Sequence, residues 1–195
     1  MSAARTARRT PAQNPRILAR IISMKVIISK KSLVVKFNAL LYNEKTMTRC
    51  FAMCKPGVLN RRLVGQVITR LENKGLKLVG LKLMNISKEL ASKHYAEHTG
   101  KPFYDELVSY ITSAPVVAMV WQMDNDDCVA LVRKVVGATK PSDAAPGTIR
   151  GDFCSHTSHN IIHASDSDAS AEREINLFFK PEELIDWKDE AEGWF

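Results

Sequence analysis

The stretch Val116-Val117-Ala118-Met119-Val120-Trp121-Gln122 decides the fold of this chain. It is a short run, rich in β-branched valine, and it contains no charged residue. β-branched and aromatic side chains favour strands, where they pack on a pleated and largely buried surface. We therefore expect a central β-strand over 116–122, with the remaining elements arranged around it.

Two strands and three helices are predicted on the N-terminal side of this strand. Between residues 63 and 73 apolar side chains recur at helical spacing, which predicts a helix with the apolar stripe Leu63, Val67, Ile68 and Leu71. Gly75 is expected to end this helix, since glycine readily takes the left-handed backbone conformation. The other predicted elements are a strand over 48–54, a strand over 76–84 with at least one buried face, a helix that begins at Ser87 and a helix over 103–113.

On the C-terminal side the pattern predicts two helices and one strand. They are a helix over 125–136, a strand over 160–164 and a helix over 167–178 that Ser167 or Asp168 is able to cap. The segment over 137–159 is expected to be irregular, since it contains Pro141, Pro146, Gly147 and Gly151. Loops of this length in compact domains are usually functional.

This order of four predicted strands and intervening helices is typical of an α+β sandwich. We predict a ferredoxin-like fold, in which a four-stranded antiparallel sheet carries helices on one face. The chain of 195 residues is long enough for one domain of about 150 residues with a further segment attached.

Basic residues are concentrated at the N terminus. The formal net charge is +7, but residues 1–46 contain ten Lys or Arg and one acid, Glu44, whereas residues 47–195 contain 18 basic and 20 acidic residues. The basic character therefore belongs to the first segment alone. We predict two parts, a basic extension over 1–46 and a folded domain over 47–195.

The extension is open to several interpretations. Its arginines, its lack of acids before Glu44 and its near-helical apolar spacing resemble an amphipathic organelle-import presequence. Alternatively, it is disordered, or it precedes a translation start at Met47. The apolar stretch over 27–41 is also able to add an extra strand. Because clustered arginines attract phosphate backbones, the extension is a candidate for binding nucleic acid as well.

Cysteine and hydropathy patterns limit the class of protein further. The four cysteines fit neither a paired-cysteine metal spacing nor a secreted disulfide framework, so we expect reduced and mostly buried thiols. No uninterrupted apolar run reaches the roughly 18 residues that a membrane span requires. We expect a soluble cytoplasmic protein or, if residues 1–46 act as a presequence, a protein of mitochondria or another organelle.

The run His159-Asn160-Ile161-Ile162-His163-Ala164-Ser165-Asp166-Ser167 carries the strongest functional signal. It places His163 among a hydroxyl, a carboxylate and a side-chain amide. A histidine with an ordinary pKa is largely neutral at neutral pH, so one ring nitrogen keeps a lone pair that can attack phosphorus without a separate base. Glu174 lies where a helix could return a carboxylate to the other ring nitrogen and fix the tautomer.

This run resembles the active-site signature of nucleoside diphosphate kinases. The segment Pro146-Gly147-Thr148-Ile149-Arg150-Gly151-Asp152-Phe153-Cys154 resembles the family's segment before the active site. Further matching blocks follow the family's order with nearly its spacing, namely Lys55-Pro56 followed by Leu63-Val64-Gly65, Lys101-Pro102-Phe103-Tyr104, residues 115–121 and residues 178–184. The resemblance covers roughly Met47 to the C terminus and implies the same ferredoxin-like fold.

The resemblance implies a ping-pong phosphotransferase. A nucleoside triphosphate would donate its γ-phosphoryl group to His163, and a nucleoside diphosphate would then accept it. Mg²⁺ is expected to arrive with the nucleotide, since no carboxylate cluster suggests a protein cage. Asp166 is the candidate helper beside the metal ion, and capping of the following turn is an equally good interpretation of this residue. The family also implies a homo-oligomer, commonly a hexamer, with the loop around Pro141 near subunit contacts.

The residues expected to hold the sugar and phosphates are assigned by their match to family motifs. Lys55 matches a lysine that bonds the ribose 3′-hydroxyl near the phosphates, and Asn160 matches the amide that shares this hydroxyl. Arg133, Thr139 and Arg150 match phosphate-binding residues. The planar guanidinium of Arg150 is suited to gripping phosphate oxygens in a fork.

The remaining assigned residues lie around the base and the nucleophile. Tyr95 and His98 match positions at the phosphate end of the site. Phe103 matches the aromatic residue on which the base stacks, and stacking without contacts to the base edge implies broad base specificity. Ser165 and Glu174 match the residues that orient the nucleophilic histidine.

The chain departs from the family pattern at the first motif. Family members usually read Lys-Pro-Asp-Gly-Val, whereas this chain reads Lys55-Pro56-Gly57-Val58-Leu59. If position 58 requires a positive φ, Val58 is strained. The segment between Trp121 and Arg133 is also slightly longer than expected. His159 stands where the family commonly has an arginine or a lysine, and Asp168 stands where an apolar residue is usual.

Alternatives to a competent kinase remain. Thiolate and imidazole are preferred zinc ligands, so a zinc site is one alternative for the set Cys154, His156, His159 and His163, although no carboxylate completes it. His94 and His98 lie one helical turn apart and could bind a metal, but a half-exposed helix face is the simpler interpretation. A family member with impaired turnover could also act as a nucleotide-binding or nucleic-acid-binding regulator.

Overall fold

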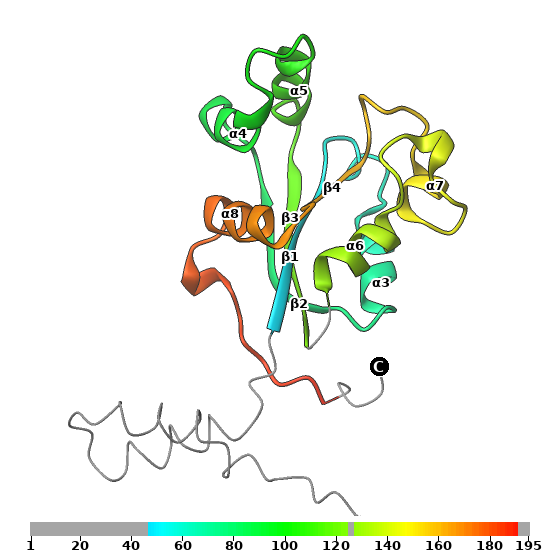
Figure 1. Cartoon of the computed structure of the whole chain (residues 1–195), viewed down its shortest axis with the longest axis vertical. Coiled ribbons are helices and arrows are strands. Elements are labelled where there is room, and N and C mark those ends of the chain that lie inside the picture. The colour runs from blue at the N-terminus through cyan, green and yellow to red at the C-terminus, as the bar shows by residue number, and fades with distance from the viewer. Residues whose placement is uncertain (1–46, 125–126, 191–195) are drawn as a thin grey trace, which may run out of the picture. The chain divides into compact units, whose positions relative to one another are not determined.

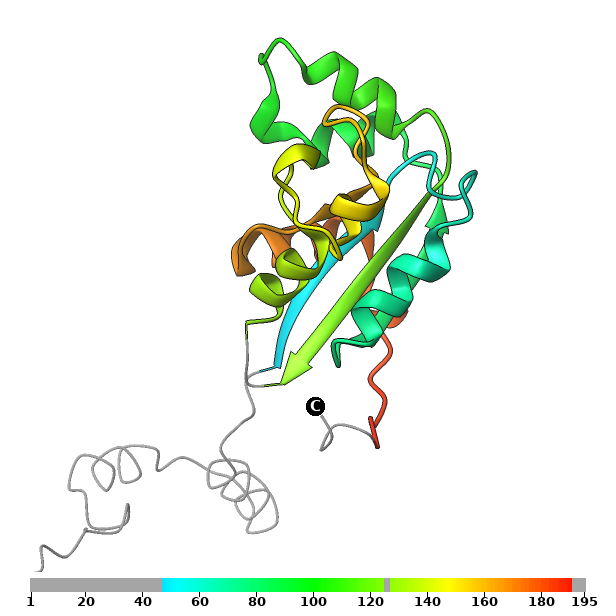
Figure 2. The ribbon, with the colours of Figure 1, turned by 90° about the vertical axis from the view of Figure 1, so that its right-hand side faces the viewer.

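The structure is a computed structural model that describes residues 47–124 and 127–190. The predictions for residues 1–46, which include the presequence and the extra strand, lie outside the described residues. In the described part, Figures 1 and 2 show one twisted sheet with helices packed against it.

Four strands of the described chain form an antiparallel sheet in the order β2-β3-β1-β4. They are β1 (Met47–Cys54), β2 (Lys77–Met84), β3 (Val116–Asp124) and β4 (Ile162–Ala164). β3 pairs with the whole of β1 through residues 117–124 and with β2 on its other side, so the predicted central strand is confirmed. The predicted four-stranded ferredoxin-like sheet is confirmed as well.

Helices cover both faces of this sheet, so the expectation of helices on one face is wrong. Figure 1 shows α3 (Val64–Glu72), α6 (Cys128–Val136) and α7 (Ile149–Phe153) on one side and α8 (Asp168–Phe178) on the other. The side of α8 is completed by α4 (Lys88–His94) and α5 (Tyr104–Ile111). The physical reason is visible in β1 and β3, whose side chains are apolar on both faces and require a cover on each.

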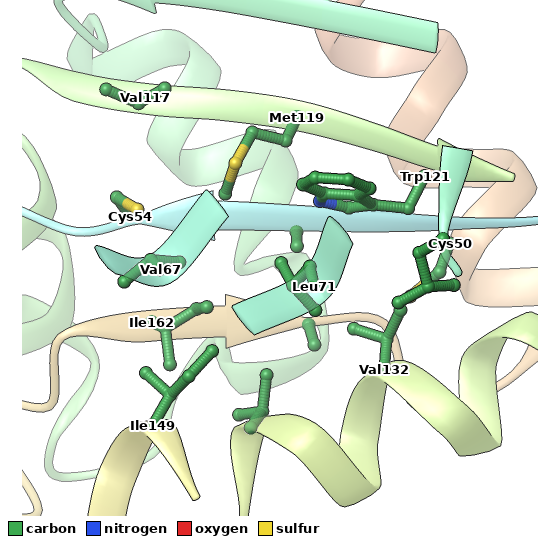
Figure 3. Close-up of a cluster of buried hydrophobic side chains, with 14 of the residues drawn as sticks. Cys50, Cys54, Val67, Leu71, Val117, Met119, Trp121, Val132, Ile149 and Ile162 are labelled. Carbon is green, nitrogen blue, oxygen red and sulfur yellow. The ribbon is translucent and has the colours of Figure 1, made fainter. Parts of the chain in front are cut away.

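The first hydrophobic cluster lies between the sheet and the helices α3, α6 and α7. Figure 3 shows Met119 and Trp121 of β3 above Leu71 of α3, with Val132 of α6 and Ile149 of α7 closing the cluster from the opposite side. Trp121, Met119, Leu71, Val132 and Ile149 are fully buried. Each such side chain stabilises the fold by about 1.5–3 kcal/mol relative to exposure.

The second cluster lies on the other face and supports the ring of His163. Phe51 of β1 stacks on Phe178 of α8, with ring centroids 4.7 Å apart. The same phenyl ring lies 5.9 Å from the ring of His163. This aromatic layer is fully buried, so it gives the candidate nucleophile a rigid wall.

Several helix ends follow the predicted signals. Ser87 and Ser167 cap α4 and α8, each accepting a hydrogen bond from a backbone amide three residues later. Gly75 follows α3 with a φ of 77°. The predicted start of α6 at residue 125 falls at a position outside the described residues, and the described helix begins at Cys128 after the capping Asp127.

The segment 137–159 is more regular than predicted. It contains a 3-10 turn over Pro141–Asp143 and the helix α7, which Thr148 caps through its hydroxyl. The expectation of an irregular segment is therefore wrong for residues 149–153. Five residues are too short for helical periodicity to be recognised, and the capping Thr148 was the available signal.

All four cysteines are free thiols, and Cys50, Cys54 and Cys128 are buried, as predicted. Burial raises the pKa of the Cys50 and Cys54 thiols to about 12, which leaves them protonated at neutral pH. In the described part of the chain, no helix combines the length and the apolar character needed to cross a membrane.

Candidate active site

His163 lies in the last strand of the sheet, where its ring is held by a carboxylate. It pairs with Met53 of β1 and points to the opposite face from its neighbours Ile162 and Ala164, which belong to the first cluster. Its Nε2 lies 2.8 Å from Oε1 of Glu174, which comes from α8. Because an ionised carboxylate only accepts hydrogen bonds, this contact keeps the proton on Nε2 and the lone pair on Nδ1.

Glu174 is itself held by a second contact. The hydroxyl of Ser165 donates a hydrogen bond of 2.6 Å to Oε2 of Glu174. Burial by itself would raise the pKa of Glu174, but the hydrogen bonds from His163 and Ser165 hold this pKa below its usual value. His163, Glu174 and Ser165 thus form one hydrogen-bonded chain in which the carboxylate stays ionised.

His94 joins this group, which the sequence did not indicate. It is 5% exposed, and its ring centroid lies 4.8 Å from that of His163. The expectation of a half-exposed helix face for His94 and His98 is therefore wrong for His94, while His98 is half-buried. Burial, together with the neighbouring His163, lowers the pKa of His94 to about 3, so its ring is neutral. Only its long-range packing against α8 and β4 could have revealed this burial.

Positive charge gathers on the other side of the nucleophile. Lys55 follows β1 and is only 6% exposed, and burial followed by the charge of Arg150 lowers its pKa to about 8. Arg150 of α7 donates to the carbonyl oxygens of Gly137 and Ile162 at 2.7 and 2.8 Å. Burial lowers the pKa of Arg150 to about 10, and the charge of Arg133 adds to the shift. Like charges crowded in a buried site favour a bound anion.

The altered turn after Lys55 places its glycine where it is needed. Gly57 has a φ of 90°, whereas Val58 is absent from the positive-φ residues of the described chain and is 1% exposed in the first cluster. The amide of Val58 donates to the carbonyl of Lys55 at 3.3 Å, which completes a turn with Pro56 and Gly57 in the middle. The expectation of strain at Val58 is therefore wrong, and the positive φ of a non-glycine residue falls instead on the exposed Arg62, at 54°.

These groups line one cavity of about 320 Å³. Of the residues assigned from the sequence, those in the lining are Lys55, Tyr95, His98, Arg133, Thr139, Arg150, Asn160, His163 and Glu174. Ser165 lies behind Glu174 and reaches the cavity only through it. Arg133 thus reaches the same cavity as the other assigned residues, although the segment between Trp121 and Arg133 is slightly longer than expected.

Phe103, like Ser165, is an assigned residue that does not line the cavity. It is 46% exposed and lies at the start of α5, with its ring 5.7 Å from that of His98 in an edge-to-face arrangement. Lys101 lies 5.8 Å from the centre of the same ring. Phe103 therefore stands beside the cavity next to one of its wall residues.

Five buried polar atoms in this cavity wall lack a hydrogen-bond partner among the described residues. Two are the ring nitrogens of His94, and the other three are the Oδ1 atom of Asn160, the hydroxyl of Tyr95 and the Nε atom of Arg150. A buried polar group without a partner costs about 1–3 kcal/mol. These atoms are suited to a polar ligand that supplies the missing hydrogen bonds.

The cavity also contains an ion pair that sequence analysis missed. Arg173 of α8 and Glu97 of the 3-10 turn Ala96–His98 are 2.9 Å apart and both line the cavity. No spacing in the sequence brings these two residues together, since they meet only through the packing of α8 beside α4.

The predicted zinc alternative has no support in the described coordinates. The metal-ligand grouping found there contains His94, His163 and Glu174 and omits Cys154, His156 and His159. The thiol of Cys154 donates to the carbonyl of His156 at 3.3 Å, and His159 packs on the ring of Tyr110. These three residues have separate roles.

Comparison with known proteins identifies the class of molecule. The family model described as nucleoside diphosphate kinase matches residues 48–184. A nucleoside diphosphate kinase of Staphylococcus epidermidis is 55% identical over 148 residues, which are 76% of this chain and 98% of the relative. One from Archaeoglobus fulgidus is 54% identical over 148 residues, covering 76% and 97%.

Solved structures agree with the sequence relatives. A halophilic nucleoside diphosphate kinase from Halobacterium salinarum, in complex with CDP, superposes with a TM-score of 0.71 at 53% identity and covers 75% of this chain and 96% of its own. A nucleoside diphosphate kinase family protein from Babesia bovis gives a TM-score of 0.72 at 39% identity, with coverage of 75% and 98%.

By fold, site and relatives, this chain is a nucleotide-binding enzyme of the phosphotransferase class. It belongs to the nucleoside diphosphate kinase family.

Proposed function

We propose that this chain transfers the γ-phosphoryl group of a nucleoside triphosphate to a nucleoside diphosphate through a phosphohistidine on His163. The observation that carries the proposal is the contact of 2.8 Å between Nε2 of His163 and Glu174, which leaves Nδ1 as the nucleophilic atom. Nδ1 forms a bond to the γ-phosphorus while the bond to the β,γ-bridging oxygen breaks, and the diphosphate leaves with that electron pair. A second nucleoside diphosphate reverses the step.

The charge that develops during transfer has partners on both sides. The imidazole becomes positive as its Nδ1 bonds phosphorus, and the carboxylate of Glu174 stabilises this charge at 2.8 Å. Lys55, Arg150 and Arg133 are proposed to bind the phosphate oxygens, on which negative charge is spread. Thr139 and His98 are proposed to complete the phosphate end.

The sugar and base are proposed to occupy the rest of the cavity and its rim. The unpartnered Oδ1 of Asn160 is suited to accept a hydrogen bond from a ribose hydroxyl that Lys55 also reaches. Tyr95 is proposed to offer its unpartnered hydroxyl at the phosphate end instead. The exposed ring of Phe103 offers a face for stacking that does not depend on the identity of the base.

Magnesium is proposed to enter with the nucleotide. Apart from Glu174, the acidic residues of the cavity lining are Glu97 and Asp166, too few for a cage of oxygen ligands. The carboxylate of Asp166 already accepts a hydrogen bond of 2.5 Å from Ser170, which supports its role in capping α8. The bound ion would neutralise part of the phosphate charge, while the residues of this chain orient the phosphate chain.

The test is phosphoenzyme formation. Purified protein incubated with γ-labelled ATP and Mg²⁺ should acquire acid-labile, base-stable phosphate and pass it to any nucleoside diphosphate. His163→Ala should abolish both the label and the exchange, because the covalent acceptor is lost while the fold is kept. Substantial exchange in this variant would contradict the mechanism. A wild-type chain that bound nucleotide without labelling would instead favour a regulator with impaired turnover.

The exposed leucines of the edge strand β2 support the proposal of a homo-oligomer, with a hexamer as the expected size. β2 is an edge strand of the sheet and exposes Leu81 at 54% and Leu83 at 65%. The C-terminal segment donates hydrogen bonds to the carbonyls of Leu78 and Val79, but Leu81 and Leu83 lie beyond these contacts. Exposed apolar side chains on an edge strand favour pairing with another chain. The segment around Pro141 is proposed to lie near other subunit contacts. Light scattering of the full chain would give the mass, and Leu81→Lys together with Leu83→Lys should lower it.

Residues 1–46 are proposed to be a separate basic extension that is dispensable for catalysis by residues 47–195. Deleting them should keep phosphoryl transfer and remove any affinity for nucleic acid, because they carry ten of the 28 basic residues against a single acid. The proposed location is the cytoplasm, with a mitochondrion or another organelle as the alternative if the extension acts as a presequence. Fusion of residues 1–46 to a fluorescent protein would separate these two locations.

A further inference from the structure

The buried ring of His94 has no role in the proposed reaction. His94 of α4 is 5% exposed, and neither of its ring nitrogens has a hydrogen-bond partner in the described structure. Its ring stands nearly perpendicular to that of His163, at an interplanar angle of 81°. Buried polar atoms without partners are costly, so two on one ring require an explanation.

The unpartnered ring belongs to a set of converging metal ligands. Nδ1 of His94 lies 3.7 Å from Oε1 of Glu174, and Nε2 of His163 lies 2.8 Å from the same oxygen. One ligand atom from each of the three residues lies within 4.8 Å of the other two. Neither ring nitrogen of His94 is engaged in a hydrogen bond, so this ring can turn a lone pair toward a metal ion.

We propose that His94, His163 and Glu174 bind a zinc ion, or a transition metal with the same preference for imidazole, and that the bound ion inhibits phosphoryl transfer. The inhibitory part rests on the proposed function of His163. Two imidazoles and one carboxylate are a common protein ligand set for zinc, and the fourth position faces the cavity. Binding exchanges one proton, on Nε2 of His163, for the metal ion.

The geometry requires a modest contraction of the group. Ligand atoms around tetrahedral zinc lie about 3.3 Å apart, given zinc–nitrogen distances of about 2.0 Å. The contact between His163 and Glu174 opens from 2.8 Å toward this value, while the widest separation closes from 4.8 Å. His163 is at the partly exposed end of the set and supplies the adjustable ring.

The same chemistry explains why magnesium would not occupy this site. Magnesium prefers an octahedron of oxygen ligands, whereas this set offers two nitrogens and one carboxylate. Metal on Nε2 withdraws electrons from the ring and displaces the contact with Glu174, so Nδ1 becomes a weaker nucleophile. The site is therefore selective for the inhibitor over the metal that accompanies the nucleotide.

Metal binding is tested directly on the full chain without nucleotide, because nucleotides chelate metals. Titration with Co²⁺ should produce the visible absorption of a tetrahedral site with one ion per chain, which Zn²⁺ then displaces. His94→Gln should weaken Co²⁺ binding at least tenfold. The matched control is His156→Gln, which removes an exposed histidine outside the set and should bind Co²⁺ as the wild type does.

A second variant protects the test against misfolding of His94→Gln. His163→Gln removes the other imidazole at a partly exposed position and should also weaken Co²⁺ binding at least tenfold. Absence of a tetrahedral signal in the wild type, or wild-type affinity in a folded His94→Gln or in His163→Gln, would overturn the site. These measurements do not depend on catalysis, so their failure is distinct from failure of the proposed reaction.

Inhibition is measured in a single turnover. Enzyme loaded with Zn²⁺ and freed of excess metal is mixed with γ-labelled ATP and Mg²⁺, and labelling of His163 should be at least tenfold slower than after treatment with a chelator. In His94→Gln, loaded and chelated samples should label at the same rate, each compared with that variant alone. Equal rates for loaded and chelated wild type, with metal still bound, would overturn the inhibitory role.

Discussion

The two groups of residues around His163, the candidate nucleophile, differ in how many of their polar atoms have hydrogen-bond partners in the free protein. On the carboxylate side, Glu174 accepts hydrogen bonds at both oxygens, from His163 at 2.8 Å and from Ser165 at 2.6 Å. On the phosphate side, Lys55 and Arg150 lie in mutual repulsion, and Asn160 keeps an unpartnered oxygen. The first side is preorganised, whereas the second is proposed to be completed by the phosphates of a bound nucleotide.

The largest effect is expected from a change on the carboxylate side. Glu174→Gln keeps the shape but replaces an obligate acceptor with an amide that can donate to Nε2 of His163 and leave the proton on Nδ1. A comparable loss of tautomer control costs about 10⁴ in rate in a serine protease. We expect phosphoenzyme formation to fall by on the order of 10³ or more in single-turnover labelling.

The matched control for this change is Ser165→Ala, which removes one hydrogen bond but leaves the carboxylate. A loss of roughly ten- to a hundredfold is expected, since a hydrogen bond to a charged group contributes about 1.5–3 kcal/mol. Equal effects of the two variants would show that Glu174 acts only through its position and not through its charge.

On the phosphate side, Lys55→Met should change function and stability in opposite directions. Loss of the ammonium should weaken nucleotide binding by on the order of 100-fold, as measured by calorimetry. The free protein should become more stable at neutral pH, because burial lowers the pKa of Lys55 from 10.5 to about 8, a cost on the order of 3 kcal/mol.

The pH dependence of the stability gain fixes its cause. A lowered lysine pKa penalises the wild type fully below about pH 8, and the penalty disappears above about pH 10.5. The advantage of Lys55→Met in chemical denaturation should therefore shrink between these two values. A gain that stayed constant over this range would attribute the effect to packing instead of charge.

Phe103→Ala tests whether the exposed ring belongs to the phosphate-side ligand site. We expect all nucleotides to bind more weakly by a similar factor, corresponding to about 1–3 kcal/mol for base–aromatic stacking. Calorimetric titration of the variant with four nucleoside diphosphates would measure this loss of affinity. Loss of affinity for one base alone would reveal a contact to a base edge, and no loss would place the base elsewhere.

The smallest effects concern the turn that carries Lys55. Substituting Gly57→Asp, Val58→Gly and Leu59→Val gives the usual family motif Lys-Pro-Asp-Gly-Val. We expect this variant to be less stable, because it places an aspartate at the φ of 90° of Gly57 and removes the buried side chain of Val58. Arg62→Gly should instead stabilise it by about 1 kcal/mol or less, because the residue has a φ of 54°. Thermal unfolding should show a lower melting temperature for the motif variant and a slightly higher one for Arg62→Gly, and the opposite shifts would contradict these expectations.

Sequence reasoning predicted the elements that depend on local signals. The strand over 116–122, the caps at Ser87 and Ser167 and the glycine after α3 follow from spacing and residue type within a few positions. The motif residues from Lys55 to Glu174 came from the family resemblance, and their convergence in one cavity needed the structure.

Features that depend on long-range packing were missed for identifiable reasons. His94 has the spacing of a surface helix residue, and its burial arises from the approach of α8 and β4. The second helical layer was foreshadowed by Phe51 and Met53 alternating with Cys50, Ala52 and Cys54, all apolar, which leaves β1 with no polar face. At the first motif, the glycine at position 57 already carried the positive φ that was expected one residue later.

Glu174 is proposed to reserve Nδ1 of His163 for phosphorus by holding the ring proton on Nε2. Nuclear magnetic resonance of the phosphoenzyme, prepared with ATP and uniformly ¹⁵N-labelled protein, reports which imidazole nitrogen is coupled to phosphorus. We expect coupling to Nδ1 of His163, with a proton retained on Nε2. Coupling to Nε2, or phosphate on a residue other than His163, would contradict it.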